Sequence, residues 1–455
     1  MTAPRELDSL PGVEGVPIAG SFFDARRDPL ELFDRAARHG GDGACLRFGP
    51  YRYLLLHSPE AIRHVFVENA RAYHKSPSYR GLAMVLGNGL ITSEGDFWKR
   101  QRRLAQPAFH RERLAGFVEA MVRDTRDMLD GWRRDGDGPF DLHDDMMRLT
   151  LRIVGHTLFS TDVQADAGAV GAAFAVALER ANDESISLVN VPTWLPLPGN
   201  RRFKKALATL DGLVHRIIAE RRALPEGGRP NDLLSMLMAA RDDDGAGMSD
   251  GQLRDEVMSL VGAGHETTAN ALAWTFHLLG DHAEVAERVA DEARAVCGDR
   301  VPALGDLPKL EYTKRVVEES MRLRPPVWVM ERVAIEDDVV RGIRVPKGTL
   351  LAAAPWCLHR DPRHWSDPER FDPERFLPEA VEARGRYTYL PFGAGPRVCI
   401  GNGFAMMEAQ LLLAMIAREH RLERAPWRAV TPDPSITLRP KGGMTMIRRR
   451  RSAAV

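Results

Sequence analysis

The stretch PFGAGPRVCIG, residues 391–401, contains the most informative cysteine of this 455-residue chain. Gly393 and Gly395 can adopt backbone angles that other residues resist, so the loop can fold tightly around the sulfur of Cys399. The apolar run 404–416 that follows predicts a helix. A thiol beside a helix N-terminus meets unpaired N–H groups, which favour the metal-binding thiolate. The alternative is an inert core cysteine, and the neighbouring residues argue against it.

Other positions of the same stretch suit a flat ligand that carries carboxylates. Gly401 removes a side chain where a flat cofactor could lie against the backbone. Arg397 places a fixed positive charge two residues before the sulfur, which suits a carboxylate. With Phe392 these residues give the spacing F-x-x-G-x-R-x-C-x-G. Five matched positions within ten residues make the pattern specific.

This pattern resembles the haem-binding signature of the cytochrome P450 superfamily, in which the cysteine thiolate is the proximal ligand of the iron. The resemblance implies a soluble, bacterial-type protein that binds haem b through Cys399. It also implies activation of O2, because electron donation from a thiolate favours cleavage of the O–O bond.

Composition excludes several other classes of protein. The chain has 63 basic and 63 acidic residues, so its charge gives no reason to expect a nucleic-acid partner. Its four cysteines lie far apart without zinc or disulfide spacing, which fits a reducing cytosol. The first forty residues contain no long apolar run. We therefore expect a cytoplasmic protein without a signal peptide or membrane anchor.

Hydrophobic periodicity predicts a mainly α (α+β) fold, with a large helical domain and small accessory β-sheets. The segment 45–56 alternates around Gly49-Pro50 and predicts a hairpin. Helical periodicity runs from about 59 to 299, and short strand patterns return at 332–354 and 430–449. Loops are predicted at 76–89, 191–200, 225–230 and 242–247.

No repeat or low-complexity linker divides the chain, so we predict a single domain over residues 1–455. Its parts would be a β-rich N-terminal part at about 1–70, a helical core at about 71–330, and the cysteine loop with the C-terminal part at about 331–455. The run Arg448–Arg451 is interpreted as the solvated end of a strand.

A second chemical motif lies in a long predicted helix. The segment 249–252, SDGQ, is typical of a capping box and would open a helix that ends near Leu279. Gly262 and Gly264, midway along it, each cost about 1 kcal/mol of helix stability relative to alanine. Together with the acid and hydroxyls that follow, they suggest a helix relaxed to admit a ligand. A solvated polar turn is the alternative.

The residues AGHETT at 263–268 are similar to the P450 family's oxygen-activation motif. That resemblance implies that Glu266 belongs to a proton-delivery network and that Thr267 hydrogen-bonds the dioxygen-derived group. General acid catalysis requires such groups within hydrogen-bond reach, directly or through water. We interpret His265 as a packing or surface residue.

A charged pair is predicted to support the cysteine loop. Glu319 and Arg322 are three residues apart on a predicted helix, hence on one face. The spacing alone is weak, but the helix stops at Leu323-Arg324-Pro325-Pro326, as it does in the family. The segment FDPERF at 371–376 matches a later family loop, which makes Arg375 the implied third member. Losing a partner of such a buried pair leaves an uncompensated charge.

Four basic or aromatic residues are implied by the resemblance to contact the haem propionates. Trp98 and Arg102 lie four apart on a predicted helix, and Arg332 and Arg397 are further candidates. An exposed basic helix is the alternative for the first pair. The charge density at 99–103 also suggests a docking face for an acidic electron carrier.

The predicted substrate pocket is the least specific part. By analogy its walls come from 76–86, the region near 182–191, 260–263, 327–330 and 436–438. Trp328 makes one wall bulky and apolar, which favours a lipophilic substrate of terpenoid or fatty-acyl type; ordinary core packing is the alternative. The individual candidates are Trp328, Val329, Met330, Ile436 and Thr437.

The sequence therefore predicts a haem-thiolate monooxygenase that hydroxylates or epoxidises a lipophilic small molecule, leaning towards secondary metabolism. Because no flavin or iron–sulfur domain is visible, electrons from NAD(P)H would arrive through a ferredoxin and its reductase. We expect a monomer. The alternatives are a peroxide-driven peroxygenase, a non-catalytic haem-binding protein and a non-haem cysteine hydrolase. The acid–alcohol pair argues against the first two, and the last lacks a recognisable histidine partner.

Overall fold

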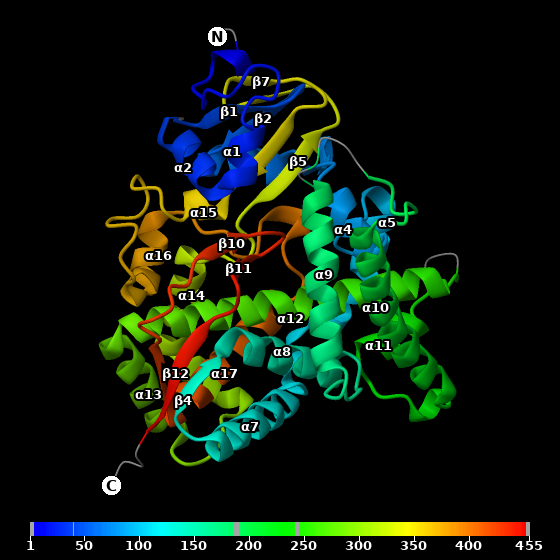
Figure 1. Cartoon of the computed structure of the whole chain (residues 1–455), viewed down its shortest axis with the longest axis vertical. Helices are drawn as coiled ribbons and strands as arrows, with labels where there is room; N and C mark the ends of the chain where they lie inside the picture. The colour runs from blue at the N-terminus through cyan, green and yellow to red at the C-terminus, as the bar shows by residue number, and fades with distance from the viewer. Residues whose placement is uncertain (1–3, 40, 186, 188–190, 242–244, 452–455) are drawn as a thin grey trace. The chain divides into compact units, whose positions relative to one another are not determined.

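The computed structural model describes residues 4–39, 41–185, 187, 191–241 and 245–451. Its helices and strands are numbered in sequence order, as labelled in Figure 1. The chain divides into two compact units. Unit 1 comprises Met1–Tyr79 and Met321–Cys399, and unit 2 comprises Arg80–Ser320 and Ile400–Val455. Each unit thus draws on two separate stretches of sequence, and the single-domain organisation stays a prediction.

Unit 1 is built around a five-stranded sheet with the strand order β1-β2-β8-β5-β3. The predicted hairpin is confirmed, because β1 and β2 pair antiparallel and Gly49 turns the chain with a φ of 59°. β8 pairs parallel to β2 and antiparallel to β5. The strands are β1 (Gly43–Phe48), β2 (Tyr51–Leu56), β3 (Tyr73–Lys75), β5 (Met330–Ala334), β8 (Leu350–Ala353) and the separate pair β6 (Asp338–Val340) and β7 (Ile343–Val345).

Short helices flank this sheet. The sheet and the helical segment at 59–68 bury one core, which includes Leu54, Ile62, Phe66 and Leu351. The helices are η1 (Leu7–Ser9), α1 (Phe22–Arg27), α2 (Pro29–His39), α3 (Pro59–Arg63), η2 (His64–Glu68), η3 (Ala70–Ala72), α15 (Pro355–Leu358), η7 (Pro373–Phe376), α16 (Pro378–Arg384) and η8 (Gly395–Arg397).

Unit 2 is organised around the 32-residue helix α12 (Asp250–Asp281), which α8, α10 and α17 contact (Figure 1). Nearly every residue of α12 from Leu253 to Leu279 is buried or half-buried, so the helix is apolar on most sides. Its predicted capping box is present: Ser249 Oγ accepts from the Gln252 amide, and Gln252 Oε1 accepts from the Ser249 amide.

The remaining elements of unit 2 surround this helix. Its helices are α5 (Gly95–Ala105), η4 (Gln106–Phe109), α6 (Arg111–Ala115), α7 (Val118–Asp135), α8 (Leu142–Leu158), α9 (Ala167–Ser185), α10 (Pro198–Ala223), η5 (Glu226–Gly228), α11 (Leu233–Ala239), α13 (Ala283–Cys297), η6 (Leu304–Lys309) and α17 (Asn402–Glu419). Its strands are β4 (Gly138–Asp141), β12 (Thr445–Arg450) and β9 (His420–Arg424) in one antiparallel sheet, with β10 (Pro432–Pro434) and β11 (Leu438–Pro440) in another. The helices α4 (Tyr79–Leu86) and α14 (Glu311–Leu323) each cross a unit boundary.

Two predictions about local structure were wrong. The segment 76–89 is not wholly a loop, because α4 occupies eight of its residues. Serine and glycine at its ends mark the turns correctly but hide the short apolar helix between them. The prediction of a solvated strand end at 448–451 holds for Arg449 and Arg450, which are exposed at the end of β12. It is wrong for Arg448, whose side chain is buried with its guanidinium against Trp132 and Phe140. Part of the predicted loop at 242–247, residues 242–244, lies outside the described residues.

Candidate active site

The cysteine loop is a tight turn followed by a short helix. Gly393 and Gly395 have φ values of 75° and 66°, as the sequence predicted. A Cβ at Gly395 would lie 1.9 Å from the carbonyl oxygen of Phe66, so only glycine fits there. The Cys399 amide donates to the carbonyl oxygen of Phe392 at 2.9 Å, which closes the loop. The thiol of Cys399 is exposed, and α17 begins three residues later.

Arg322 is fully buried and supports the segment that precedes this loop. Its guanidinium donates to the carbonyl oxygens of His359 at 2.9 Å, Pro368 at 2.6 Å and Arg370 at 3.0 Å. The guanidinium also lies 5.0 Å from the ring of Trp365. Charge-assisted bonds to three carbonyls fix a stretch of backbone that has no regular secondary structure of its own.

Arg375 holds the same stretch from its other end. It is half-buried, and it donates to Ser366 Oγ at 3.4 Å and to the carbonyl oxygen of Asp367 at 3.0 Å. Glu319, like Arg322, lies on α14 with no exposed surface. The two arginines therefore converge on residues 366–370, although their role in haem incorporation stays a prediction.

In unit 2, Glu266 of the predicted oxygen-activation motif contacts Thr437, a residue that was predicted to line the substrate pocket. Glu266 is buried on α12, and its Oε1 accepts a 2.6 Å hydrogen bond from the hydroxyl of Thr437. Burial raises the pKa of Glu266, while the Thr437 hydrogen bond and the charge of Arg439 oppose the rise. Thr437, predicted as a pocket residue, thus contacts the predicted proton-delivery acid directly.

The hydrogen-bonded chain continues beyond this pair. Asn270 Nδ2 donates to Thr437 Oγ1 at 3.1 Å, and Asn270 Oδ1 lies 2.8 Å from Nε2 of His143. Burial lowers the pKa of His143, so the neutral ring that donates to Asn270 is favoured. Sequence reasoning missed both residues. Asn270 lies four residues after Glu266 on one helix face and could have been found from that spacing; His143 had no such signal.

Thr267 and the two motif glycines have local partners. The Thr267 hydroxyl donates to the carbonyl oxygen of Ala263 at 2.8 Å, and its residue is half-buried. The helix is continuous through Gly262 and Gly264, so the predicted relaxation is not seen. A Cβ at Gly264 would lie 2.9 Å from Cγ2 of Val154, so this glycine permits close packing of α12 on α8.

Of the two roles predicted for His265, packing or surface, the structure shows packing. Its side chain has no exposed surface, and its ring centroid lies 4.9 Å from that of Phe174 on α9. Nδ1 bonds the carbonyl oxygen of Val261 one turn earlier, and burial lowers the pKa of the ring to about 4. The alternative of a solvated polar turn is therefore wrong for this part of α12.

A second attachment to α12 was not predicted. The side chains of Asp255 and Glu256 accept hydrogen bonds from the backbone amides of Asn88 at 2.8 Å and Leu90 at 3.1 Å. Glu256 is only 1% exposed, and burial raises its pKa to about 7. A Cβ at Gly89 would lie 2.2 Å from Ser259 Oγ, so the loop rests directly on the helix. This loop leads into α5.

The candidate propionate residues lie on separate elements. Trp98 and Arg102 are half-buried, one turn apart on α5, as predicted. Arg332 is 8% exposed on β5, donates to its neighbour's carbonyl oxygen at 2.8 Å and lies 4.7 Å from the ring of Phe66. Arg397 is half-buried at the end of η8. Their contacts with a propionate stay predictions.

The candidate pocket residues differ in burial. Trp328 is buried, and its ring packs 5.7 Å from that of Phe33, which is ordinary core packing within unit 1. Val329, Met330 and Ile436 are half-buried. Residues 186 and 188–190 of the predicted wall near 182–191 lie outside the described residues. The pocket itself stays a prediction.

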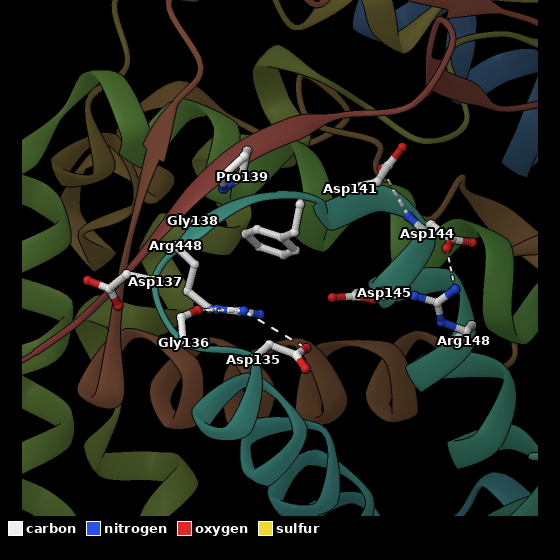
Figure 2. A pocket seen from close by; sticks show the side chains of 11 residues that line it. Asp135, Gly136, Asp137, Gly138, Pro139, Asp141, Asp144, Asp145, Arg148 and Arg448 are labelled. Atoms are coloured by element: carbon white, nitrogen blue, oxygen red, sulfur yellow. Dashed lines mark hydrogen bonds and ion pairs between the residues drawn. The ribbon is translucent and has the colours of Figure 1, made fainter.

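A surface hollow of about 420 Å³ in unit 2 contains none of these residues. In Figure 2 a dashed line marks the ion pair between Arg448 and Asp135, and Asp141, Asp144 and Arg148 lie on the other side of the view. Three of its acidic side chains pair with arginines: Asp135 with Arg448, and both Asp144 and Asp145 with Arg148. The hollow is thus an ion-paired surface feature.

Comparison with known proteins decides the family. The chain matches the family model described as Cytochrome P450 over residues 10–446. The chain belongs to the cytochrome P450 family. It is 40% identical to cyclooctatin synthase of Streptomyces melanosporofaciens over 93% of this chain and 92% of that protein. It is 34% identical to pentalenene oxygenase of Streptomyces avermitilis over 96% and 94%.

A solved P450 has the same fold. The crystal structure of the cytochrome P450DA heme domain aligns with a TM-score of 0.88 at 26% identity, over 99% of both chains. The fold prediction is therefore confirmed, and the chain is a P450 monooxygenase. Among the described residues, no helix has the length and apolar character needed to cross a membrane.

The cysteine loop fits the haem that the family implies. Cys399 is exposed, and a cysteine thiolate is the donor by which P450s hold haem iron. The loop is closed by backbone hydrogen bonds, which fix the backbone of Cys399. Gly401, beside it, has no side chain to obstruct a flat ring.

Proposed function

We propose that this P450 inserts one oxygen atom from O2 into a lipophilic alkene or alkane of terpenoid type. One observation carries the assignment of the iron ligand: Cys399 is exposed at the end of a loop that backbone hydrogen bonds close. Haem b would supply the oxidation chemistry. The residues of the chain bind and orient the reactants and manage protons.

In this proposal Cys399 would bind the iron, with Phe392 and Gly401 beside the ring. Arg102, Arg332 and Arg397 would hold the propionates, since guanidinium groups suit carboxylates, and Trp98 would donate its indole N–H to one of them. A thiolate beside fixed positive charge is favoured over the thiol. Glu319, Arg322 and Arg375 hold the polypeptide around the loop and take no part in the chemistry.

Proton delivery is assigned to Glu266 and Thr267. Burial raises the pKa of Glu266, which favours the protonated form that a general acid requires. Its partner Thr437 accepts from Asn270 and donates to Glu266, so the carboxyl group is oriented by a hydrogen-bonded chain. Thr267 is half-buried one residue later on the same helix.

The substrate class is supported by the relatives. Pentalenene oxygenase is named for an alkene. Another relative, cyclooctat-9-en-7-ol 5-monooxygenase of Streptomyces melanosporofaciens, is 37% identical to this chain and is named for an unsaturated alcohol. A fatty-acyl substrate is the second candidate, because the half-buried Val329, Met330 and Ile436 are equally compatible with an alkyl chain. A screen of both classes for compounds that shift the haem spin state separates them. A response to fatty acids alone would contradict the terpenoid assignment.

We infer that electrons come from a ferredoxin and its NAD(P)H-dependent reductase. On α5, Lys99 and Arg103 are exposed, and Arg100 is half-buried. A basic surface of this kind attracts an acidic protein in a salt-dependent way. The affinity for a ferredoxin should therefore fall as ionic strength rises. Turnover of the purified chain with NADPH and no added protein would contradict the inference. We also propose a cytoplasmic monomer.

The decisive experiment is a reduced carbon-monoxide difference spectrum. Wild-type protein should give the spectrum of a thiolate-ligated haem, and Cys399→Ser should lose it. Substrate-dependent NADPH consumption in a reconstituted system then distinguishes a monooxygenase from a non-catalytic haem protein. Product formation that requires added peroxide and ignores NADPH would favour the peroxygenase alternative.

A further inference from the structure

His359, a residue outside the predicted site, connects the Arg322 support to the cysteine loop within unit 1. It directly follows α15, and its side chain has no exposed surface. Its backbone carbonyl oxygen accepts from Arg322 at 2.9 Å. Its Nε2 lies 2.8 Å from the backbone nitrogen of Leu390, just before the loop begins. His359 therefore bonds both the Arg322 side chain and the backbone at the start of the cysteine loop.

The donor at Leu390 determines the chemical form of the ring. A backbone N–H can only donate, so Nε2 of His359 must carry the lone pair and Nδ1 must carry the proton. A doubly protonated ring has no acceptor to offer. Burial lowers the pKa of His359 well below its usual range, and the nearby charges of Arg322 and Arg360 lower it further. Backbone groups of Arg322 and Met321 oppose this shift.

Backbone hydrogen bonds continue from Leu390 to the amide of Cys399. The carbonyl oxygen of Leu390 accepts from the Gly393 amide at 3.3 Å, which closes the first turn of the loop. The carbonyl oxygen of Phe392, inside that turn, accepts from the Cys399 amide at 2.9 Å. The position of the Leu390 amide thus sets the turn, and the turn sets the Cys399 backbone.

Packing holds the ring in this orientation. The His359 ring centroid lies 5.0 Å from that of Tyr389, the residue before Leu390. Tyr389 in turn packs 4.8 Å from Phe376 and 6.2 Å from Trp365. Rotation of the ring would break the Leu390 bond and disturb this aromatic cluster, so we treat the orientation as fixed.

We propose that His359 is a positioning residue for the iron ligand: a neutral, Nδ1-protonated ring whose Nε2 anchors the start of the cysteine loop and so maintains Cys399 as a thiolate. The proposal rests on the proposed haem-thiolate function. It predicts that an acceptor at the Nε2 position is what matters, because the Leu390 N–H is otherwise left buried and unpaired.

The test compares two substitutions in the haem-loaded full chain. His359→Leu removes the acceptor, whereas a glutamine side chain can place its amide oxygen near the Nε2 position. In a pH series of the ferrous carbon-monoxide complex, His359→Leu should raise the ratio of thiol-ligated to thiolate-ligated haem about tenfold, as expected for the loss of one buried hydrogen bond. His359→Gln should restore most of the wild-type ratio. His364→Leu, a half-buried histidine in the same segment, is the matched control and should leave the ratio unchanged.

A second measurement does not depend on the leucine variant folding. Nitrogen-15 NMR of histidine-labelled wild type, as the ferrous carbon-monoxide complex, should show the His359 signals of an unprotonated Nε2 and a protonated Nδ1. His359→Gln identifies those signals by their absence. An Nε2-protonated ring, or equal thiol fractions in wild type and His359→Leu, would overturn the proposal. A wild type that never shows a thiolate spectrum would instead refute the proposed function.

Discussion

Thr437 donates a 2.6 Å hydrogen bond to Oε1 of Glu266, across 171 residues of sequence. This bond stabilises the ionised carboxylate and so opposes the upward pKa shift that burial causes. It also orients the carboxyl group, because Thr437 is itself bonded by Asn270. The pair therefore sets both the acidity and the direction of the proposed proton donor.

Replacing Thr437 with valine should raise the pKa of Glu266 further, because the hydrogen bond that favours its ionised form is lost. The acid would then keep its proton to a higher pH. We expect the alkaline limb of the pH profile of turnover to move to higher pH. We also expect less product per NADPH, because the carboxyl group is no longer oriented. The measurement is a pH profile of coupling in a reconstituted system.

Thr437→Ser is the matched control, since it retains the hydroxyl and should keep the wild-type profile. Glu266→Gln removes the titrating group, so its profile should lack the limb altogether. If the valine variant and wild type had the same profile, Thr437 would have no part in setting the acidity of Glu266.

Glu256 should make the stability of unit 2 depend on pH. Its pKa is about 7 in the folded protein, against an ordinary value of 4.5. Because the folded pKa is raised, its stabilising contribution is fully present below pH 4.5 and is lost as pH rises through 7. Above pH 7, Glu256→Gln should be more stable than wild type by at most about 3 kcal/mol, and equally stable near pH 4.

Denaturant unfolding at several pH values measures this difference. Glutamine keeps an amide oxygen for the Leu90 amide, so the loop should stay attached. Asp255→Asn is the comparison, because Asp255 also holds this loop, through the Asn88 amide, and its substitution removes an acid beside Glu256 without removing Glu256 itself. Parallel stability curves for Glu256→Gln and wild type would contradict the prediction.

Sequence patterns were sufficient for residues whose structural role is set by residues close to them in the chain. Gly393, Gly395 and Cys399 lie within one loop, and the positive φ values of the two glycines follow from their residue type. The capping box at Ser249 and the hairpin around Gly49 are local in the same sense. Local interactions repeat from protein to protein, so a pattern is enough to identify them.

The residues that could not be predicted owe their roles to tertiary packing. His143 reaches Asn270 from another helix, and His359 reaches Leu390 across 31 residues. Nothing near either histidine in the sequence indicates a partner. The prediction that Arg448 is solvated was wrong because its neighbours in the sequence form a charged run. The aromatic rings that bury it are those of Trp132 and Phe140, far away in the sequence. Local charge does not reveal such partners.

Arg322→Lys should prevent stable haem incorporation. The guanidinium bonds three carbonyl oxygens in different directions, and a single ammonium group cannot reproduce that fork. Unsatisfied buried carbonyls and a displaced buried charge should together cost about 3 kcal/mol or more. The measurements are haem content per chain and the midpoint of urea unfolding.

Arg375→Lys tests whether burial decides the size of this effect. Arg375 is only half-buried where it donates to Ser366 Oγ at 3.4 Å and to the carbonyl oxygen of Asp367 at 3.0 Å, so its substitution should cost less haem content and stability. Equal losses for the two variants would mean that the stretch at 366–370 depends on both arginines alike. A normal haem content in Arg322→Lys would contradict the proposed support.

Thr267→Ala should separate electron use from product formation. If its hydroxyl helps to deliver protons, its removal lets reduced oxygen leave as peroxide, while NADPH consumption continues. General acid–base assistance contributes roughly a hundredfold or more, so product per NADPH should fall at least about tenfold. The measurements are the amount of product and the amount of peroxide formed per NADPH consumed, with a substrate that shifts the haem spin state.

Two variants sharpen this last prediction. Thr267→Ser keeps a hydroxyl that can bond the Ala263 carbonyl oxygen, as threonine does at 2.8 Å, so it should retain most of the coupling. Thr268→Ala removes the next hydroxyl, which is buried and acts on the pKa of Glu408. That change should lower stability and leave coupling near the wild-type ratio. If Thr268→Ala uncoupled turnover as strongly as Thr267→Ala, the effect would not be specific to Thr267, and its assigned role in proton delivery would be contradicted.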